Sequence, residues 1–427
     1  MKKILFIIQS YPSEMSANVL CDEKIMLALQ QVGSYEIHAL TYRYNFQPKE
    51  ELVHNINVHR FSRGPLWDMY TWARHQKSNW KTRMVFKITH LLLRLQQLMT
   101  IPFYPFTEWW ALLLYVHHVT KLYKQEHFDL VIAEHNGLDT LITGYLLKKK
   151  FPQIKFMPIF WDALSGAISP KYLPHKFSYQ RRIKIEYNVL KRADCAIVMK
   201  SHYSQLQNLY QHTHVFPSLV ALDLPSFSQP KTNTTAACLN LTFQKNKIYL
   251  CFAGTLSGRN MKYLASILDK TALDNLELVI ISSNEMKLYV EQIANQVHFP
   301  VRFITYMPHT QLLQLLAQVH IFVNLGVNSN TLVASKIFEY MSFGKPLIET
   351  YLRLDDANLF YLKKYPLAFL LDERCTEVAT QAAALRQFIE QNAHKHVPYE
   401  EIAPLFYKNT PDAYVQQIKK LLEEYPS

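Results

Sequence analysis

The sequence predicts an α/β protein with two Rossmann-like domains that face each other across a cleft. A chain of 427 residues is too long for one hydrophobic core, so two domains are expected. Two series of short apolar runs alternate with helical stretches, as in parallel, doubly wound sheets. A polar stretch without clear periodicity, residues 222–246, separates the two series. Because such sheets bind ligands at the carboxyl ends of their strands, the pair of domains predicts a ligand-binding cleft.

The first series defines an N-terminal domain over residues 1–221. Its opening run, KILFII, is short for the apolar core of a signal peptide and no cleavage signal follows it, so we interpret it as a buried strand. The next stretch, SANVLCDEKIMLALQQV, predicts a helix. The strands predicted for this domain are residues 3–8, 35–42, 128–135, 154–162 and 193–200.

The second series defines a C-terminal domain over residues 247–410, joined to the first by a linker at 222–246. An amphipathic tail over residues 411–427 predicts a closing helix. The strands predicted for this domain are residues 247–254, 276–283, 301–306, 319–325 and 345–350.

The net positive charge of the chain is confined to its first half. Residues 1–220 contain 27 Lys and Arg against 15 Asp and Glu, and the remainder contains 19 of each. This imbalance predicts an anionic partner: a lipid surface, a phosphorylated substrate or nucleic acid. Basic and aromatic residues do not alternate as in a recognised nucleic-acid module, which disfavours the last of these.

Several classes of protein are disfavoured by missing motifs. The five cysteines lie far apart and form no C-x-x-C pair, which indicates a reducing cytosol and neither disulfides nor a zinc site. Neither G-x-G-x-x-G nor a P-loop sequence occurs, which argues against dinucleotide oxidoreductases and P-loop NTPases. No D-x-D triplet follows a strand, and we interpret Asp355 and Asp356 as solvated loop residues. No metal is therefore expected.

The stretch SKIFEYMSFGKPLIET, residues 335–350, predicts a short helix, a stop at Gly344 and a strand. Lys336, Glu339 and Tyr340 lie at positions i, i+3 and i+4, so they are expected to share one helix face. That face is either an exposed ion pair or a binding surface. The opposite face carries the apolar residues Ile337, Phe338 and Met341.

This stretch resembles the nucleotide-sugar segment of GT-B glycosyltransferases, specifically the glycosyltransferase 4 type of bacterial surface polysaccharide assembly. FAGTLSGRNMKYL (252–264) resembles the opening of the family's donor domain. FDLVIAEHNGLDTLITGYLLKKK with FWDAL, and RADCAIVMKSHYSQLQ, resemble its acceptor domain. Together these stretches span most of the chain, while residues 64–125 and the linker match weakly.

The resemblance implies an enzyme that moves a sugar from a nucleotide-diphosphate sugar to a hydroxyl of a lipid-linked or polysaccharide acceptor. It further implies a retaining, metal-independent reaction with no cofactor besides the nucleotide sugar as co-substrate. The alternatives are a nucleotide-sugar epimerase of the same fold and, less favoured, a non-catalytic nucleic-acid-binding protein.

For the donor, Glu339 is expected to accept hydrogen bonds from the ribose hydroxyls. Lys336, Arg259 and the helix N-terminus at Ser335 are expected to offset the phosphate charge. Relatives often carry a glutamate where this chain has Leu332, so the sugar is expected to be contacted differently. The further donor-binding candidates are Gly254, Thr255, Asn328 and Asn330.

For the acceptor, the candidates follow predicted strands of the first domain: Tyr11, Glu134, His135, Asn136 and Asp162. His135 is either part of a satisfied polar turn or an acceptor contact. Asp162 is either a helix N-cap or a cleft residue. The catalytic candidates are His135, Asp162, Arg259 and Lys336, and the identity of a general base stays open.

Residues 78–124 combine Lys and Arg with Trp, Tyr, Phe and Leu. Such a composition is typical of an interfacial amphipathic segment, and equally of a buried helix pair in a large domain. The basic first half favours the interfacial interpretation. We therefore expect a cytoplasmic protein, peripheral on the inner face of the cell membrane.

Overall fold

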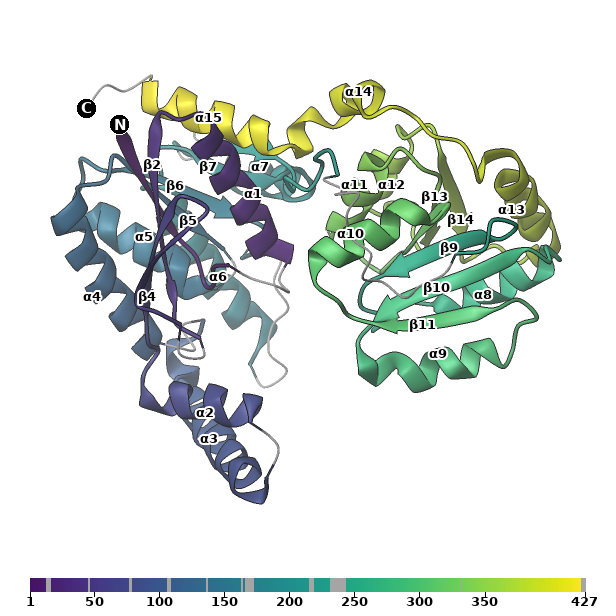
Figure 1. Cartoon of the computed structure of the whole chain (residues 1–427). Coiled ribbons are helices and arrows are strands. Elements are labelled where there is room, and N and C mark those ends of the chain that lie inside the picture. The colour runs from purple at the N-terminus through teal and green to yellow at the C-terminus, as the bar shows by residue number, and fades with distance from the viewer. Residues whose placement is uncertain are drawn as a thin grey trace. The chain divides into compact units, whose positions relative to one another are not determined.

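The computed structural model describes residues 1–427 apart from 13–16, 45–46, 77–78, 106–108, 136, 163, 166–172, 215–218, 231–242, 331 and 424–427. The chain divides into two compact units, Met1–Pro225 with Pro411–Ser427, and Ser226–Thr410 (Figure 1). The C-terminal helix thus belongs to unit 1, and Ser226–Thr410 forms unit 2.

Unit 1 contains an eight-stranded sheet in the order β3-β4-β2-β1-β5-β6-β7-β8. Neighbouring strands are parallel except for β3, which runs antiparallel to β4 at the edge. The strands are β1 (Lys2–Ile7), β2 (Tyr35–Tyr42), β3 (Glu50–Val53), β4 (Ile56–Phe61), β5 (Leu130–Glu134), β6 (Lys155–Phe160), β7 (Ala196–Met199) and β8 (Leu219–Leu222). The helices are α1 (Ala17–Gln31), α2 (Pro65–His75), α3 (Trp80–Met99), α4 (Trp109–Glu126), α5 (Leu138–Lys150), α6 (His175–Leu190), α7 (Lys200–Tyr210) and α15 (Pro411–Glu423), with a 3₁₀ turn at Ile101–Phe103.

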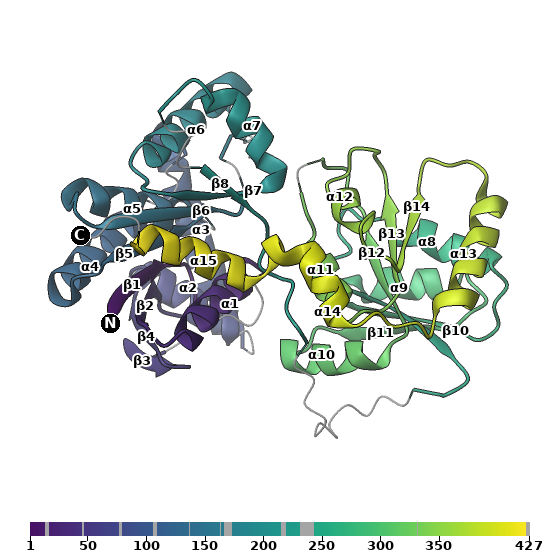
Figure 2. The same cartoon turned by 90° about the horizontal axis from the view of Figure 1, so that it is seen from above.

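Both faces of this sheet are covered, because successive side chains of a strand point to opposite faces. Leu5 of β1 packs in a core with α4, α5 and α7, whereas Ile4 packs on the other face with α1 and α15. Helix α15 lies alongside α1 (Figure 2). Its Tyr414 hydroxyl donates to the Asp223 carbonyl at 2.7 Å. The last helix is therefore part of the core of unit 1.

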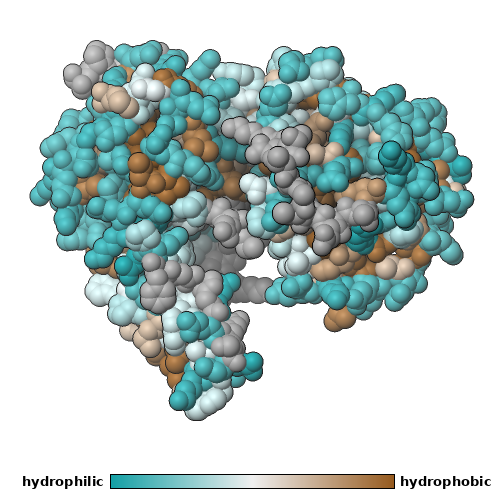
Figure 3. Space-filling model, in the orientation of Figure 1, coloured by the Kyte–Doolittle hydropathy of each residue, from teal (hydrophilic) through white to brown (hydrophobic). Residues whose placement is uncertain are grey.

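Helices α2 and α3 pack against each other, away from the sheet (Figure 1). Phe86 stacks on Tyr70, with ring centroids 5.3 Å apart, so it joins the two helices. Many other large apolar side chains of α3 are exposed, and Figure 3 shows hydrophobic surface on this part of the molecule. By contrast, α4 buries one face in the core of unit 1, including Tyr115 and Val119. The buried-helix interpretation of residues 78–124 therefore holds for α4 but is wrong for α3.

Unit 2 contains a six-stranded, wholly parallel sheet in the order β11-β10-β9-β12-β13-β14. The strands are β9 (Ile248–Ala253), β10 (Leu276–Ser282), β11 (Val301–Thr305), β12 (Ile321–Leu325), β13 (Leu347–Tyr351) and β14 (Ala368–Asp372). The helices are α8 (Met261–Lys270), α9 (Lys287–Ala294), α10 (His309–Gln318), α11 (Ser335–Ser342), α12 (Leu359–Leu362), α13 (Val378–Asn392) and α14 (Tyr399–Ile402), with 3₁₀ turns at Asn284–Met286 and Ala403–Asn409.

Each sheet has one point where the strand order reverses direction. In unit 1 this point lies between β1 and β5, and in unit 2 it lies between β9 and β12. The loops after these strands diverge to opposite faces, so they leave a crevice at the carboxyl edge where doubly wound sheets bind ligands. The switch points therefore select the loops after β1, β5, β9 and β12 as candidate site segments.

The predicted α/β class with two parallel sheets is confirmed, and every predicted strand has a counterpart. The sequence prediction missed β3, β4, β8 and β14. Residues 231–242 of the predicted linker lie outside the described residues. Among the helices that the structure describes, none combines the length and the apolar character needed to cross a membrane.

Candidate active site

Glu339 lies at the centre of a charged cluster in unit 2. Its Oε1 accepts a hydrogen bond from Lys336 Nζ at 2.6 Å, and its Oε2 lies 2.7 Å from His309 Nε2. Burial alone would raise the pKa of Glu339, but Lys336 and His309 hold that pKa well below its usual range. The carboxylate is therefore ionised at neutral pH. Each carboxylate oxygen can accept a second hydrogen bond, so a ligand is able to join this cluster.

The helix that carries this cluster is fixed by its apolar side. Ile337, Phe338 and Met341 are fully buried, as predicted. Tyr340 is buried too: its ring stacks on Phe322 with centroids 4.6 Å apart, and its hydroxyl accepts from the Ala253 N–H at 3.0 Å. The prediction that Tyr340 shares the polar face is therefore wrong. Its hydroxyl is hydrogen-bonded to the backbone at the end of β9, so burial leaves no polar group unpaired. The same bond connects α11 to the switch point.

The loop after β9 contributes Gly254, Thr255 and Arg259. The Gly254 N–H donates to the Ile281 carbonyl at 3.0 Å, and the exposed Thr255 hydroxyl lies 3.3 Å from the Tyr306 hydroxyl. The Arg259 side chain is half-buried, and its Nη1 is a buried atom without a hydrogen-bond partner among the described residues. Because an unpaired buried donor is unfavourable, Nη1 is suited to a ligand that brings an acceptor.

Two carboxyl groups lie near the Arg259 guanidinium. Burial lowers the pKa of Arg259, and the nearby Glu349, Tyr340 and Asp356 oppose that shift. Asp356 is 4% exposed, and burial raises its pKa to about 6. The prediction that both aspartates are solvated loop residues is therefore wrong for Asp356. It holds for Asp355, which is exposed and pairs with Arg353 at 2.8 Å.

Glu349 holds a buried hydrogen-bond network behind α11. Its carboxylate oxygens accept from Asn324 Nδ2 at 2.7 Å and from Asn358 Nδ2 at 2.8 Å. Asn358 Oδ1 in turn accepts from the N–H of Ala334, the residue before α11, at 2.9 Å. This chain of bonds connects strand β13 to the N-terminus of α11. It therefore fixes the position of the Lys336 and Glu339 backbone.

Because the carboxyl group of Glu349 is buried, we expect unit 2 to lose stability as the pH rises. Complete burial raises the pKa of Glu349 to about 8, above its value in the unfolded chain. Protonation is thus favoured in the folded state, so the stabilising contribution is fully present below the unfolded pKa of 4.5, falls progressively as the pH rises, and is gone once the pH passes about 8. Between pH 5 and pH 9 we expect the free energy of unfolding to fall by roughly 2–4 kcal/mol from this group. Urea unfolding at several pH values measures it.

Glu349→Gln stays uncharged, so its stability is expected to vary less with pH than that of the wild type. Glu390→Gln is the matched control, since Glu390 pairs with Arg386 on an exposed helix face. Wild type and Glu349→Gln with parallel pH profiles would contradict the assignment.

The loop after β12 passes close to β13. Gly326 donates to the Thr350 carbonyl at 2.8 Å, and a Cβ at this position would lie 2.4 Å from the same oxygen, so only glycine fits. Asn328 is exposed, and Asn330 Nδ2 lies 3.4 Å from Asp355 Oδ2. The Leu332 side chain is 46% exposed, so it is not part of the core of unit 2. Ser335 begins α11 without a side-chain cap.

In unit 1, His135 follows β5 beside the other switch point. Its Nδ1 lies 2.7 Å from the Asp162 carbonyl, so Nδ1 carries the proton and Nε2 keeps its lone pair in the neutral ring. Burial lowers the pKa of His135, which favours that neutral form. The arrangement leaves Nε2 able to accept a proton or a hydrogen bond.

Glu134 forms a buried carboxyl pair with Asp22 of α1. Glu134 accepts from Trp161 Nε1 at 3.1 Å and from the Gln9 N–H at 3.4 Å. Both carboxyl groups are at most 1% exposed, and burial raises the pKa of each. Two adjacent buried carboxylates do not both ionise easily, so the pair is expected to keep one proton. Glu134 is placed to hold the loop after β1 rather than to contact a ligand from the surface.

The remaining acceptor candidates are more scattered. Asp162 is exposed, and residues 164–165 just after it form a turn, so the described residues contain no helix that Asp162 caps. Tyr11 is 2% exposed and packs in the core beside α1, so the structure places its side chain away from the surface. Asn136 lies outside the described residues.

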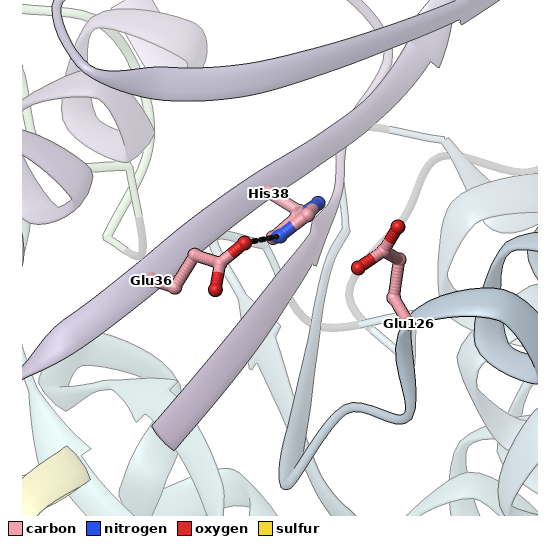
Figure 4. Close-up of side chains that lie close together, drawn as sticks. All are labelled: Glu36, His38 and Glu126. Atoms are coloured by element: carbon pink, nitrogen blue, oxygen red, sulfur yellow. Dashed lines mark hydrogen bonds and ion pairs between the residues drawn. The ribbon is translucent and has the colours of Figure 1, made fainter. Parts of the chain in front are cut away.

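One further cluster has the composition of a metal site. Glu36, His38 and Glu126 each place a ligand atom within 4.8 Å of the others (Figure 4). Lys3 Nζ, however, lies 2.6 Å from Glu126 and 3.8 Å from Glu36, so an ammonium group already supplies the positive charge between the two carboxylates. The cluster lies at the amino ends of β1 and β2, the opposite edge from His135. It is explained as an ion-pair network.

The sequence prediction missed residues that enter these sites from distant segments. His309 begins α10, thirty residues before its partner Glu339. Asp22 lies within helix α1. His202 is 5% exposed, and it lies close enough to Asp162 and His135 for both to shift the pKa of His202. No local motif marks any of the three. The one signal in the sequence was for Asp22, a charged residue among the apolar residues of its helix.

Two parallel doubly wound sheets with paired switch points and a returning C-terminal helix define the GT-B fold. Sucrose-phosphate synthase from Thermosynechococcus elongatus superposes on the chain with a TM-score of 0.64, at 12% identity over 99% of both chains. Anabaena HepE, solved with UDP and glucose, gives 0.59 at 15% identity over the whole of both chains. A protein assigned as UDP-N-acetylglucosamine 2-epimerase from Listeria monocytogenes gives 0.55 at 11% identity, over 100% of this chain and 98% of its own. These likenesses establish the fold.

No protein-family model and no curated protein matches the sequence.

Proposed function

We propose that this protein is a glycosyltransferase that moves a sugar from a nucleoside-diphosphate sugar to an acceptor hydroxyl. The observation that carries the proposal is the Glu339 cluster with Lys336 and His309. Lys336 lies in the first turn of α11 and Glu339 in the next, on the helix that follows β12 at the β9–β12 switch point. A ribose diol offers two donors for an ionised carboxylate, and a diphosphate needs cations and helix N–H groups. The cluster offers each of these.

In this proposal, Glu339 binds the ribose hydroxyls while Lys336 and Arg259 meet the diphosphate. The unpaired Nη1 of Arg259 supports its part, because a phosphate oxygen would supply the missing acceptor. The departing phosphate gains charge as the sugar bond breaks, and fixed cations stabilise that charge without a metal. HepE binds UDP and glucose, which supports a uridine nucleotide as the first donor to test. The retaining outcome rests on the sequence resemblance.

On the acceptor side, we assign His135 to the incoming hydroxyl. Its Nδ1–H is fixed by the Asp162 carbonyl, so Nε2 is oriented to accept a hydrogen bond. Asp162 acts through that carbonyl, as a positioning residue. The acceptor proposed is lipid-linked or a polysaccharide.

Donor binding and turnover test this function directly. Thermal shift with UDP, UDP-glucose, UDP-galactose and UDP-N-acetylglucosamine is expected to show stabilisation by UDP and at least one sugar. Binding and transfer are expected to persist in EDTA. Incubating each bound donor without an acceptor and recording proton NMR separates the rival activity, since an epimerase would convert the sugar with no acceptor present. No stabilisation by any nucleotide would contradict the proposal.

The surface of α3 supports attachment of unit 1 to an anionic membrane. Apolar residues spaced three or four apart form one stripe along this helix. Such a stripe usually packs against a core, but here it is exposed. It consists of Trp80, Met84, Ile88, Leu91, Leu95 and Leu98. Exposed Lys87 and Arg94 each precede a stripe residue by one position, so they lie about 100° around the helix. A basic flank beside an apolar stripe is the pattern of a helix lying in a membrane interface.

We expect the protein to co-sediment with vesicles that contain phosphatidylglycerol, and high salt to release most of it. Leu91→Glu/Leu95→Glu is expected to abolish sedimentation, since it puts charge where apolar side chains would insert. Leu288→Glu is the matched control, because Leu288 is 72% exposed on α9 of unit 2. Lys87→Glu/Arg94→Glu should weaken binding at low salt.

Wild-type protein that stays in the supernatant at low salt would contradict membrane attachment. A stripe that instead pairs two copies would appear as a dimer by sedimentation velocity, lost in Leu91→Glu/Leu95→Glu, without vesicle binding.

A further inference from the structure

A second concentration of charge lies in unit 2, at the edge of the sheet opposite to Glu339. A cavity of about 210 Å³ opens there, lined by residues 318–320, Lys345 and residues 393–396. His320 immediately precedes β12 and Lys345 precedes β13 by two positions, so both stand at the amino ends of strands. The Glu339 cluster follows the carboxyl end of β12. The cavity is therefore separate from the proposed nucleotide site.

All titratable side chains that line this cavity are basic: His320, Lys345, His394, Lys395 and His396. No carboxylate is among its lining residues. His394, Lys395 and His396 form no side-chain hydrogen bond or ion pair with the residues that the structure describes. Concentrated positive charge without a counter-charge favours an anionic ligand.

Lys345 fixes one wall of the cavity. Its Nζ donates to the carbonyls of Ala317 and Val319, at 2.6 and 2.7 Å, at the end of α10. An ammonium group has three donors, so one stays available to a ligand. Burial lowers the pKa of Lys345 to about 8. The two carbonyls therefore do not fully offset the loss of hydration, and an anion in the cavity would.

A backbone hydrogen bond fixes the tautomer of His320, so that its Nε2 is a hydrogen-bond donor. Its Nδ1 accepts from the Tyr249 N–H at 3.1 Å, so the proton of the neutral ring is on Nε2. The ring meets that of His394 edge-on, with centroids 5.1 Å apart. Burial lowers the pKa of His320, and the nearby His394 and Lys345 side chains lower it further, because a positive charge beside the ring disfavours its protonated form.

The basic segment is clamped in place by Gly344. Gly344 has φ +67°, and its carbonyl accepts from the Val397 N–H at 2.9 Å. A Cβ on Gly344 would lie 2.0 Å from the Val397 carbonyl oxygen. Glycine at this position thus stops α11 and also lets residues 393–397 close against β13. The wall carrying His394, Lys395 and His396 is therefore built by the fold.

We propose that this cavity binds a small phosphate-bearing anion, at a site separate from the nucleotide site. Its size suits one or two phosphate groups rather than a nucleotide. Charge-assisted hydrogen bonds from Lys345, Lys395 and the histidines would hold the phosphate oxygens. Lys345, whose pKa burial lowers to about 8, gains charge as the pH falls from 8.5 to 6.0, so binding takes up a proton and is tighter in mild acid.

Isothermal titration calorimetry with inorganic pyrophosphate, at pH 6.0 and pH 8.5, tests the site. Wild type is expected to bind at pH 6.0 and to bind about fourfold more weakly at pH 8.5, where Lys345 is mostly neutral. His394→Asn/Lys395→Gln is expected to bind at least about tenfold more weakly than wild type at pH 6.0. Both residues are exposed, so the variant is expected to fold, which circular dichroism checks.

Two control variants keep the result specific. Lys270→Gln removes an exposed lysine at the end of α8 and should leave binding unchanged. Lys336→Gln weakens any pyrophosphate binding at the proposed nucleotide site and should leave the acid-favoured binding intact. Absence of binding by wild type at pH 6.0 would overturn the proposal. So would binding that His394→Asn/Lys395→Gln retains in full, or that Lys336→Gln abolishes.

Discussion

Replacing Glu339 with alanine is expected to weaken UDP binding by roughly 1.5–3 kcal/mol, or about 10- to 150-fold in Kd. The reason is the loss of two charge-assisted hydrogen bonds to the ribose. The variant also leaves Lys336 and His309 without their shared carboxylate. Because the pKa of Glu339 is held far below neutrality, its contribution to wild-type binding should not vary between pH 6 and pH 9. Titration calorimetry with UDP measures both effects.

Glu291→Ala is the matched control, since Glu291 also lies one helical turn from a lysine, Lys287, on an exposed face of α9. It should bind UDP as the wild type does. If Glu339→Ala lowers the melting temperature but leaves UDP affinity unchanged, the Lys336–Glu339 contact is only an ion pair. Glu339→Gln, which keeps the shape, separates the loss of charge from the loss of packing.

Arg259→Ala is expected to lower kcat by about 10²- to 10³-fold, the range seen when a group that stabilises transition-state charge is removed. The donor KM should change much less, because the charge on the leaving phosphate is largest in the transition state. Lys336→Ala should behave in the same direction. Steady-state kinetics with the donor sugar identified by thermal shift provide the measurement.

Arg259→Lys distinguishes charge from geometry. A lysine keeps the positive charge but not the planar fork, so partial recovery is expected. Arg353→Ala, in the loop after β13, removes a partly exposed arginine that pairs with Asp355 and should retain wild-type kcat. If Arg259→Ala and Lys336→Ala raise KM and leave kcat unchanged, both residues bind the ground state and do not stabilise the leaving group.

Much of the proposed donor site was predictable because its signals are local. Residues 335–350 predict a helix, a stop and a strand, and the structure has α11, Gly344 and β13 in these places. Lys336 and Glu339 were predicted on one face because a separation of three residues brings side chains together on any helix. The structure places the pair 2.6 Å apart. The position of Arg259 after β9 likewise follows from the strand–loop–helix order.

The sequence by itself thus determined the α/β class, the two sheets and the local arrangement of the proposed donor residues. These features depend on periodicity and on separations within one turn or one loop, which the order of residues contains. Only the tertiary structure decided which polar groups are buried and which distant segments meet. Tyr340 and Asp356 look exposed in sequence but lie inside unit 2, and His309 reaches Glu339 across thirty residues. The composition of α3 fits both an interfacial and a buried helix, and the structure leaves its apolar stripe exposed. The physical reason is that burial and charge pairing depend on neighbours supplied by other elements, so no local pattern encodes them.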